Sequence, residues 1–467
     1  MKRRAPDNRV VDVEMLDVRE PDATGRARGR SHHRRVAVVA GASVLGVLAA
    51  VVVATNVAEL RREDTRLSAL ADVPGILAPL DGAPHELWRT PGRELLADSP
   101  TALVLRDGDA GLRGVDPATG ATLWVRASDP RETCLPVGGA SEPSLVVCGH
   151  VRDADDPAAH GPAAVVALDV ATGADRATLA LATAPMTIDV VDDDVVVSRV
   201  GDRSTVQVVR WDPSADRVAW TYRSDPGRAD ALLDEGWWLA IAERATLWFG
   251  RSTMLALDAG SGREVPADDP PAIGRVAQQR QLPDGAWLTW GGSVAGQRSA
   301  MAVRDADGTV RFTFDGEPWL ADVSDGSEPD VVPVQRAVSL DVLGLDARTG
   351  ERVWSARTMQ GLHPYLQVAG VAIAAGPLRV VAVDLATGAR LWETGAPVGR
   401  PRTWPVTDGR VVILLRWRDG ALGLAARELR TGAERWWVPT PEDVMYVEVA
   451  GRHLLLLHTR DEVVAYG

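Results

Sequence analysis

The stretch that decides the fold is VVAVDLATGARLW, residues 380–392. It starts with four apolar residues, three of them β-branched, as is typical of a strand buried in a sheet. In the turn that follows, the Asp384 carboxylate can accept hydrogen bonds from nearby backbone N–H groups. Gly388 can adopt the left-handed conformation that closes such a hairpin with a bulge. The stretch therefore predicts a β-hairpin whose second strand carries Trp392.

The same unit recurs along the chain, and in its strongest copies the tryptophan is the fourth residue after the turn glycine. These copies are Asp116–Gly120 with Trp124, Asp346–Gly350 with Trp354, Asp384–Gly388 with Trp392, and Glu428–Gly432 with Trp436. Weaker copies are Asp169–Gly173, Asp258–Gly262, Asp212 to Trp220, and Asp305 to Phe312. The spacing of roughly 36–56 residues is that of a four-stranded propeller blade. The sequence thus predicts an all-β propeller of about eight four-stranded blades, with seven to nine compatible with the pattern.

The two ends of the repeat region complement each other. Glu86-Leu87-Trp88 has the pattern of an outer strand without a blade before it, and residues 446–466 have the pattern of inner strands without an outer one. Pairing them would close the ring and leave no open sheet end. Two sets of residues are then structural. The tryptophans pack between blades, each contributing about 2–3 kcal/mol: Trp88, Trp124, Trp220, Trp354, Trp392 and Trp436. The glycines close turns: Gly120, Gly173, Gly262, Gly350, Gly388 and Gly432.

A long apolar run precedes the repeats. Residues 36–58, VAVVAGASVLGVLAAVVVATNVA, contain no charged residue, and about 20 apolar residues of helix cross a bilayer. Five arginines stand just before this run, namely Arg26, Arg28, Arg30, Arg34 and Arg35. Their excess predicts a single-pass helix with the N-terminus in the cytoplasm and the propeller outside the cell. A cleaved signal peptide is the alternative, but the run exceeds the usual h-region of about 7–15 residues.

The predicted organisation has four parts: a disordered basic cytoplasmic tail (1–35), a transmembrane anchor helix (36–58) in the lipid bilayer, a linker (59–84) and the propeller ectodomain (85–467). The formal net charge of the chain is -13. Residues 1–35 hold ten Lys/Arg and six Asp/Glu, so the remainder carries -17. A region with such a strong negative charge repels the phosphate backbone of nucleic acids, and nucleic acid is excluded as a partner class.

The Asp-x-x-Thr-Gly-x-x-x-Trp pattern resembles the repeat of quinoprotein (PQQ-type) dehydrogenases and of their non-enzymatic, BamB-like relatives, over roughly residues 85–467. The enzymes of this family use a pair of adjacent cysteines and a calcium site of Glu, Asn and Asp. Here the only cysteines, Cys134 and Cys148, are apart, and the only asparagines are Asn8 and Asn56. The resemblance therefore implies the non-enzymatic branch, with no cofactor and no catalytic or metal-binding residue.

Three groups of residues remain as candidate sites. Outside the cytoplasm Cys134 and Cys148 are expected to form a disulfide between adjacent strands, worth ~3 kcal/mol for a loop of about 15 residues; two free thiols or a redox pair are the alternatives. Asp192-Asp193-Asp194 lies between two apolar stretches, which predicts a hairpin turn, although carboxylates could also bind Ca²⁺. His453 and His458, five residues apart on a strand, would face opposite sides and could not share a metal.

Three functions are compatible with these features. The favoured hypothesis is a membrane-anchored, extracytoplasmic interaction scaffold that binds another envelope protein or peptide and performs no catalysis. The second is an ectodomain that senses a ligand or a carbohydrate. The third is an unusual PQQ-dependent dehydrogenase. The identity of the partner does not follow from the sequence.

Overall fold

The computed structural model describes residues 61–63, 65–70, 73–108, 111–129, 131–138, 143–151, 162–230, 239–242, 246–249, 255–264, 277–282, 284–291, 300–327, 330–336, 339–396 and 404–467. The chain divides into two compact units, Met1–Thr65 and Arg66–Gly467. The predicted tail and the predicted anchor helix lie outside the described residues. Within the described ranges, no helix combines the length and the apolar character needed to cross a membrane.

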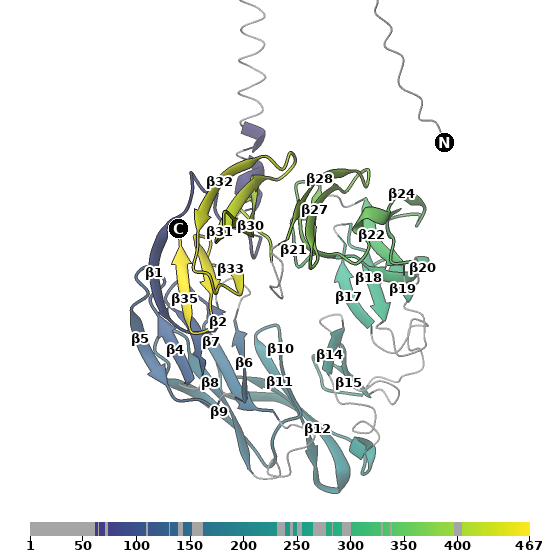
Figure 1. Cartoon of the computed structure of the whole chain (residues 1–467). Helices are drawn as coiled ribbons and strands as arrows, with labels where there is room; N and C mark the ends of the chain where they lie inside the picture. The colour runs from purple at the N-terminus through teal and green to yellow at the C-terminus, as the bar shows by residue number, and fades with distance from the viewer. Residues whose placement is uncertain are drawn as a thin grey trace, which may run out of the picture. The chain divides into compact units, whose positions relative to one another are not determined.

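The unit Arg66–Gly467 is built from antiparallel sheets of consecutive strands (Figure 1). Four such sheets are complete four-stranded meanders in which each strand pairs with the next. Their strands are β2 (Glu94–Asp98), β3 (Leu103–Asp107), β4 (Gly111–Val115) and β5 (Thr122–Arg126); β6 (Glu132–Val137), β7 (Leu145–His150), β8 (Ala163–Asp169) and β9 (Asp175–Leu181); β10 (Thr187–Val191), β11 (Asp194–Gly201), β12 (Thr205–Asp212) and β13 (Arg217–Arg223); and β29 (Val406–Thr407), β30 (Val411–Arg418), β31 (Ala421–Glu428) and β32 (Glu434–Pro439). The 3-10 turn η3 (Asp202–Ser204) joins β11 to β12.

Three further sheets vary this plan. In the described residues one has three strands, β14 (Leu239–Ala242), β15 (Thr246–Phe249) and β16 (Leu255–Asp258). One has seven, β17 (Ala277–Gln281), β18 (Trp287–Gly291), β19 (Ala300–Arg304), β20 (Val310–Pro318), β22 (Val331–Arg336), β23 (Val342–Asp346) and β24 (Arg352–Ala356). The third has five strands in the described residues, in the order β21 (Val323–Ser324), β25 (His363–Val368), β26 (Val371–Ala375), β27 (Arg379–Asp384) and β28 (Arg390–Gly395). Strand β21 pairs parallel with β25. The 3-10 turn η5 (Arg357–Met359) precedes β25. The seven-stranded sheet contains two meanders that share the long strand β20.

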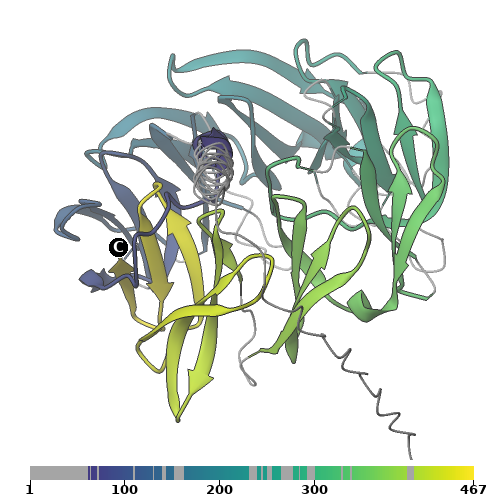
Figure 2. The same ribbon diagram turned by 90° about the horizontal axis from the view of Figure 1, so that it is seen from above.

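The last sheet joins the two ends of the repeat region. Strand β1 (Glu86–Pro91) pairs antiparallel with β35 (Glu462–Tyr466), which follows β33 (Tyr446–Ala450) and β34 (Leu454–His458). The predicted pairing of N- and C-terminal strands is therefore present, and Figure 2 shows the same strands from above. The prediction of a mostly β fold is confirmed, whereas the number of blades and the closure of a propeller ring stay predictions.

Apolar cores lie between successive sheets. In most of the described sheets the strands carry apolar residues on both faces, and these faces pack against neighbouring sheets. Val412 and Leu414 of β30, for example, pack with Trp392 of β28, whereas Val411 and Ile413 of the same strand pack with residues of β33–β35. This two-sided burial explains why the strand segments are continuous apolar runs.

The segment before β1 packs on the sheets. Residues 65–70 are helical, and Leu67, Leu70 and Ile76 are buried in the core between the β25–β28 and β29–β32 sheets. The Leu77 N–H donates to the Thr407 carbonyl (2.9 Å), and the following residue bonds the turn between β33 and β34. The boundaries 59–84 of the linker stay a prediction, but its second half is held by hydrogen bonds and apolar contacts.

Candidate functional site

The repeat tryptophans lie between sheets. Each of five indole Nε1 groups donates a hydrogen bond of 2.6–2.9 Å to a backbone carbonyl of the following repeat: Trp88 to Pro117, Trp124 to Val170, Trp220 to Ala259, Trp354 to Leu385 and Trp392 to Leu429. The acceptor is always the residue after the acid that starts the turn. These tryptophans therefore tie one sheet to the next.

The turn glycines form the other half of this contact. Their φ values are between 67° and 72°, a region that L side chains rarely adopt. A Cβ at Gly120, Gly173, Gly262, Gly388 or Gly432 would lie 2.5–2.7 Å from the tryptophan of the preceding repeat. Phe312 takes the place of the tryptophan against Gly350. The indole ring and the missing side chain are thus complementary in shape.

Two aromatic residues depart from this pattern. Trp436 on β32 has no such turn to meet, because the strands of the next sheet, β35 and β1, are the two ends of the repeat region. It is half-buried against the neighbouring core. Trp319, which sequence reasoning missed, is 3% exposed and donates to the Leu362 carbonyl at 3.0 Å. It lies outside the Asp-to-Trp spacing, so the repeat gave no signal for it.

The two cysteines form a disulfide, as predicted. Cys134 on β6 lies directly opposite Cys148 on β7 in the strand register, and both residues are buried. The bond therefore joins adjacent strands within one sheet. Neither sulfur is available as a nucleophile or a metal ligand.

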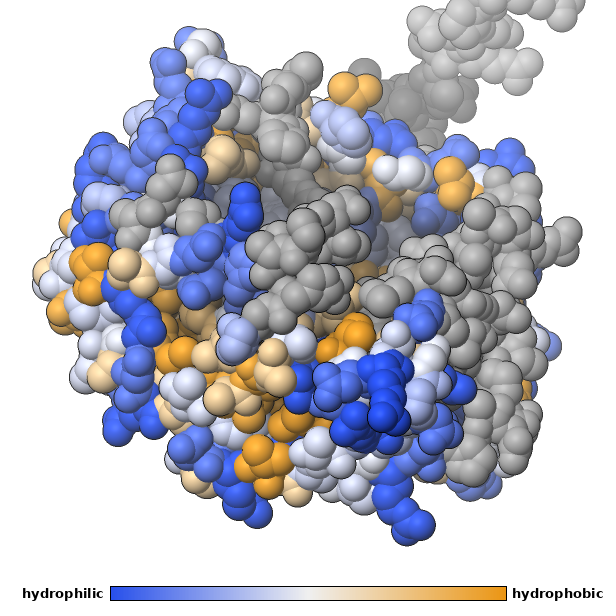
Figure 3. Space-filling model, turned by 90° about the horizontal axis from the view of Figure 1, so that it is seen from below, coloured by the Kyte–Doolittle hydropathy of each residue, from blue (hydrophilic) through white to orange (hydrophobic). Residues whose placement is uncertain are grey.

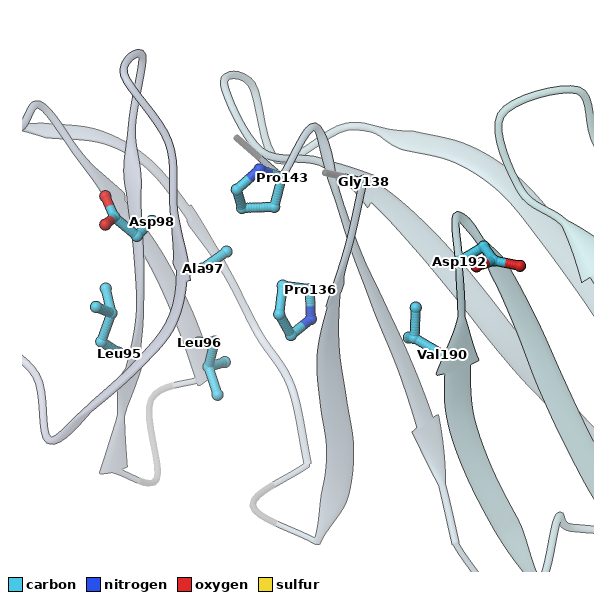
Figure 4. Close-up of a pocket in the computed structure, with 9 residues that line it drawn as sticks. All are labelled: Leu95, Leu96, Ala97, Asp98, Pro136, Gly138, Pro143, Val190 and Asp192. Atoms are coloured by element: carbon cyan, nitrogen blue, oxygen red, sulfur yellow. The ribbon is translucent and has the colours of Figure 1, made fainter. Parts of the chain in front are cut away.

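A cavity lies against the first strands of three successive sheets. It measures about 420 Å³ and is lined by residues of β2, β6 and β10 and of the turns that follow them. Leu96, Pro136, Pro143 and Val190 contribute apolar walls, and the carboxylates of Asp98 and Asp192 lie at opposite ends (Figure 4). Its volume is that of a small-molecule or side-chain site.

Each of these strands is the end strand of its sheet. An end strand has one edge of backbone N–H and C=O groups without a strand partner. Pro136 fits in β6 for this reason, since a residue without an N–H is tolerated where the edge is unpaired. The cavity thus combines apolar side chains with free strand edge in the described residues.

Asp98 connects the cavity wall to the sheet that joins the two ends of the chain. Its carboxylate accepts the backbone N–H of Gly451, in the turn between β33 and β34. Burial raises the pKa of Asp98, the Gly451 hydrogen bond opposes that rise, and the charge of Glu448 adds to it. Burial likewise raises the pKa of Asp189 on β10. Two carboxyl groups near the cavity are therefore costly to ionise.

A buried histidine lies next to Glu448, whose charge also acts on Asp98. His458 on β34 is fully buried, and its Nδ1 lies 3.0 Å from the Arg93 carbonyl. A carbonyl oxygen can only accept, so Nδ1 carries a hydrogen and Nε2 faces Glu448 Oε1 at 2.5 Å. Neither of these two atoms has another hydrogen-bond partner in the described residues.

Aromatic rings cover the imidazole. Tyr446 stacks on His458 with ring centroids 4.3 Å apart and 7° between the planes, and its hydroxyl donates to the same Arg93 carbonyl at 3.1 Å. Trp404 lies against Tyr446 at 5.4 Å. Burial, together with nearby carboxylates, raises the pKa of Tyr446 well above its usual value. The cluster fixes the β1–β2 connection against β33 and β34.

The remaining sequence candidates lie apart from each other. Asp192 to Asp194 span the hairpin turn between β10 and β11, with Asp192 at φ 57°. Arg210 pairs with Asp194 at 2.5 Å and with Asp192 at 3.5 Å. His453 is exposed in a turn whereas His458 is buried. Among the described residues no group of three or more His, Cys, Asp or Glu side chains is placed to hold a metal ion.

Comparison with known proteins gives one family match. Residues 81–193 match the family described as "Outer membrane protein assembly factor BamB". No curated protein matches the chain. Among solved structures, BamB from Moraxella catarrhalis is 16% identical, with a TM-score of 0.43 over 82% of this chain and 99% of that one.

Two further solved structures are similar in the same range. Quinohemoprotein alcohol dehydrogenase from Comamonas testosteroni is 12% identical, with a TM-score of 0.41 over 86% of this chain and 77% of that one. A eukaryotic initiation factor is 9% identical, with a TM-score of 0.45 over 79% and 91%. The matched segment 81–193 contains the first Asp-to-Trp repeat together with the disulfide. The chain is thus similar to this family over residues 81–193, which is about a quarter of its length.

Proposed function

We propose that the chain is a membrane-anchored, extracytoplasmic scaffold that binds an extended segment of another envelope protein and performs no catalysis. The observation that carries this proposal is the cavity between β2, β6 and β10. Apolar walls formed by Leu96, Pro136 and Val190 suit an apolar side chain. The free edges of the three strands suit the backbone of an extended peptide.

The ends of the cavity suggest the charge of the bound segment. Asp98 and Asp192 lie at either end, and the body of the protein is strongly acidic. Because burial raises the pKa of Asp98, a cationic group beside it would stabilise the ionised carboxylate. The proposed partner is therefore a segment that combines apolar residues with Lys or Arg.

The family match supports a scaffold in preference to a quinone enzyme. The matching family is named for an assembly factor, and a propeller supports many activities, so the site must decide. In this chain Cys134 and Cys148 are bonded across two strands, and no asparagine occurs after Asn56. The residues present do not fit a site built from adjacent cysteines and a Glu–Asn–Asp calcium set.

The anchor and the closed ring are parts of the same proposal. We place residues 36–58 in the membrane, with the N-terminus in the cytoplasm, because the run lacks charge and arginines precede it. A disulfide is also typical of an oxidising compartment. The β1–β35 pairing supports a ring closed by strands from both ends. External protease should digest the ectodomain in intact cells; a protein released by alkaline washing would contradict the anchor.

Site-specific photo-crosslinking of the full-length protein tests the scaffold. A photoreactive residue at Asp192, whose side chain is 48% exposed at the cavity, should give a discrete adduct with one envelope protein. The matched control is Asp216, an exposed turn residue of the same sheet, which should give none. Val190→Trp, which fills the cavity, should abolish the adduct and leave the melting temperature within a few degrees.

The outcome is decisive in both directions. Equal adducts at both positions, or an adduct that Val190→Trp leaves unchanged, would show that the cavity does not bind the partner. No adduct under any growth condition would have the same meaning. Quenching of tryptophan fluorescence by PQQ with calcium-dependent dye reduction would replace the scaffold with the dehydrogenase alternative.

A further inference from the structure

A second charged region lies on the β29–β32 sheet, away from the cavity. Strands β30 and β31 have eight residues each, whereas β26 and β27 of the preceding sheet have five and six. The hairpin of β30 and β31 is therefore longer than that of β26 and β27. At the two hairpin ends Leu378 is 70% exposed and Trp417 is 42% exposed.

The strand register puts three arginines and a tryptophan on one face of this sheet. Arg416 is opposite Gly423, and Arg418 is opposite Ala421. Trp437 is opposite Ala425, two residues from Gly423. Opposed residues, and residues two apart, share a face of an antiparallel sheet. Arg427 shares this face, which is also the face on which Leu414 packs toward β28. We call Arg416, Arg418, Arg427 and Trp437 the arginine face.

Contacts within the arginine face leave several donors without an acceptor. Trp437 lies over Gly423, where a Cβ would come within 2.5 Å of the ring, and the Arg418 guanidinium lies 5.9 Å from its centroid. Glu434 accepts from Arg418 at 3.1 Å and lies 3.5 Å from Arg427. Yet Trp437 Nε1 and Arg427 Nε are buried with no partner in the described residues.

Arg416 adds a positive charge that has no ion-pair partner among the described residues. It is half-buried, and within the described part of the chain it makes no hydrogen bond or ion pair. Desolvation lowers the pKa of Arg427, and the charge of Arg416 lowers it further. A buried donor left unsatisfied costs about 1–3 kcal/mol, so an arrangement with two such atoms beside an unpaired guanidinium indicates a missing acceptor.

We propose that the arginine face binds an oxyanion, the phosphate or carboxylate group of a ligand. Such a group has two or three oxygens, and each accepts charge-assisted hydrogen bonds from guanidinium N–H donors. Arg416 supplies the charge, and Arg427 Nε and Trp437 Nε1 supply further donors. This site lies on a different sheet from the cavity, so the oxyanion proposal can be tested independently of the scaffold proposal.

Titration of the full-length protein with inorganic phosphate and with acetate, at constant ionic strength, tests the proposal. Wild type should bind at least one of them, and whichever binds more tightly identifies the ligand class. Arg416→Ala should raise the dissociation constant at least about tenfold, as expected for a lost charge-assisted contact. Trp437→Phe, which keeps a ring but removes the donor, should weaken binding by a smaller factor. Arg357→Ala, at a side chain 87% exposed in η5, is the matched control and should bind as wild type does.

A measurement without anion separates a ligand site from a structural role. Because Arg416 has a like-charged neighbour, Arg427, and no partner in the described part of the chain, Arg416→Ala should melt at the same temperature as wild type or higher. Phosphate should then stabilise wild type only. Three results would overturn the proposal: no binding of either anion, unchanged binding by Arg416→Ala, or a lower anion-free melting temperature for that variant.

Discussion

The contact between a tryptophan and the next turn glycine can be tested at Gly388. Its φ is 68°, and a Cβ there would lie 2.7 Å from two ring carbons of Trp354, which is 6% exposed. The Trp354 Nε1 also donates to the Leu385 carbonyl at 2.6 Å, three residues before the glycine. Gly388→Ala therefore imposes backbone strain and displaces a buried ring.

The expected loss of stability follows from three contributions. A non-glycine residue in the left-handed region costs about 1–2 kcal/mol. Forcing a methyl group against a packed ring costs about 1–3 kcal/mol. Weakening the indole hydrogen bond costs about 0.5–1.5 kcal/mol. Because the ring can relieve part of the overlap by moving, we expect a total of about 3–5 kcal/mol.

Two other glycines separate these contributions. Gly308 closes the turn between β19 and β20 with φ 87°, but nothing lies within 4 Å of its Cβ position. Gly308→Ala should cost only the backbone strain, about 1–2 kcal/mol. Gly82 has neither a left-handed φ nor a close neighbour, and Gly82→Ala should change stability by less than about 0.5 kcal/mol.

Urea unfolding of the full-length variants, followed by tryptophan fluorescence, gives the three free energies if the slope with urea stays the same. The reasoning would fail if Gly388→Ala and Gly308→Ala cost the same. In that case the backbone conformation alone would explain the glycine, and the tryptophan would not determine the residue at this turn.

Three further predictions follow from the same structure. Replacing Cys134 and Cys148 by Ser should lower the unfolding free energy by about 3 kcal/mol, since the bond closes a loop with a sequence separation of 14; an equal loss on adding reductant to wild type would agree, and no loss would contradict it. Burial holds the pKa of Asp98 above its ordinary value. The protonated carboxyl group therefore stabilises the folded protein fully at pH values below the ordinary pKa, and this stabilisation is lost as the pH rises through the folded pKa. Asp98→Asn should accordingly match wild type in acid and exceed it at neutral pH in urea titrations, and equal curves at every pH would refute this. Trp392→Phe should cost about 1 kcal/mol more than Trp436→Phe, because Trp392 loses a 2.9 Å hydrogen bond, and thermal melts with the order reversed would contradict it.

Local signals in the sequence predicted the hairpins well. The turn at Asp384 is fixed by residues within four positions, as the Thr387 N–H and hydroxyl bond the Asp384 carboxylate at 3.1 and 2.9 Å. The disulfide followed from the count of cysteines and from their place in two adjacent strands. Such features depend on neighbours along the chain, so a single sequence is sufficient to recognise them.

The cavity and the buried histidine depend on neighbours that are distant along the chain. His458 accompanies an exposed His453 in sequence, and nothing local distinguishes the buried from the exposed one. One of its contacts, the Arg93 carbonyl, is 365 residues away. Asp98 and Gly451 are 353 residues apart. Only the pairing of β1 with β35 brings these residues together, and no spacing rule encodes which side chains then meet.

The long-range contacts also explain why the cavity can be well defined although its strands are sheet edges. β2, which forms one wall, is fixed on its far side by Asp98 to the β33–β34 turn. The connection between β1 and β2 is fixed by His458 and Tyr446 at the Arg93 carbonyl. A ligand that orders a loose edge loses affinity to conformational entropy. For the proposed partner, holding β2 from the opposite end of the chain would lower that cost. The residues that join the two ends of the repeat region would thus determine affinity without contacting the bound segment.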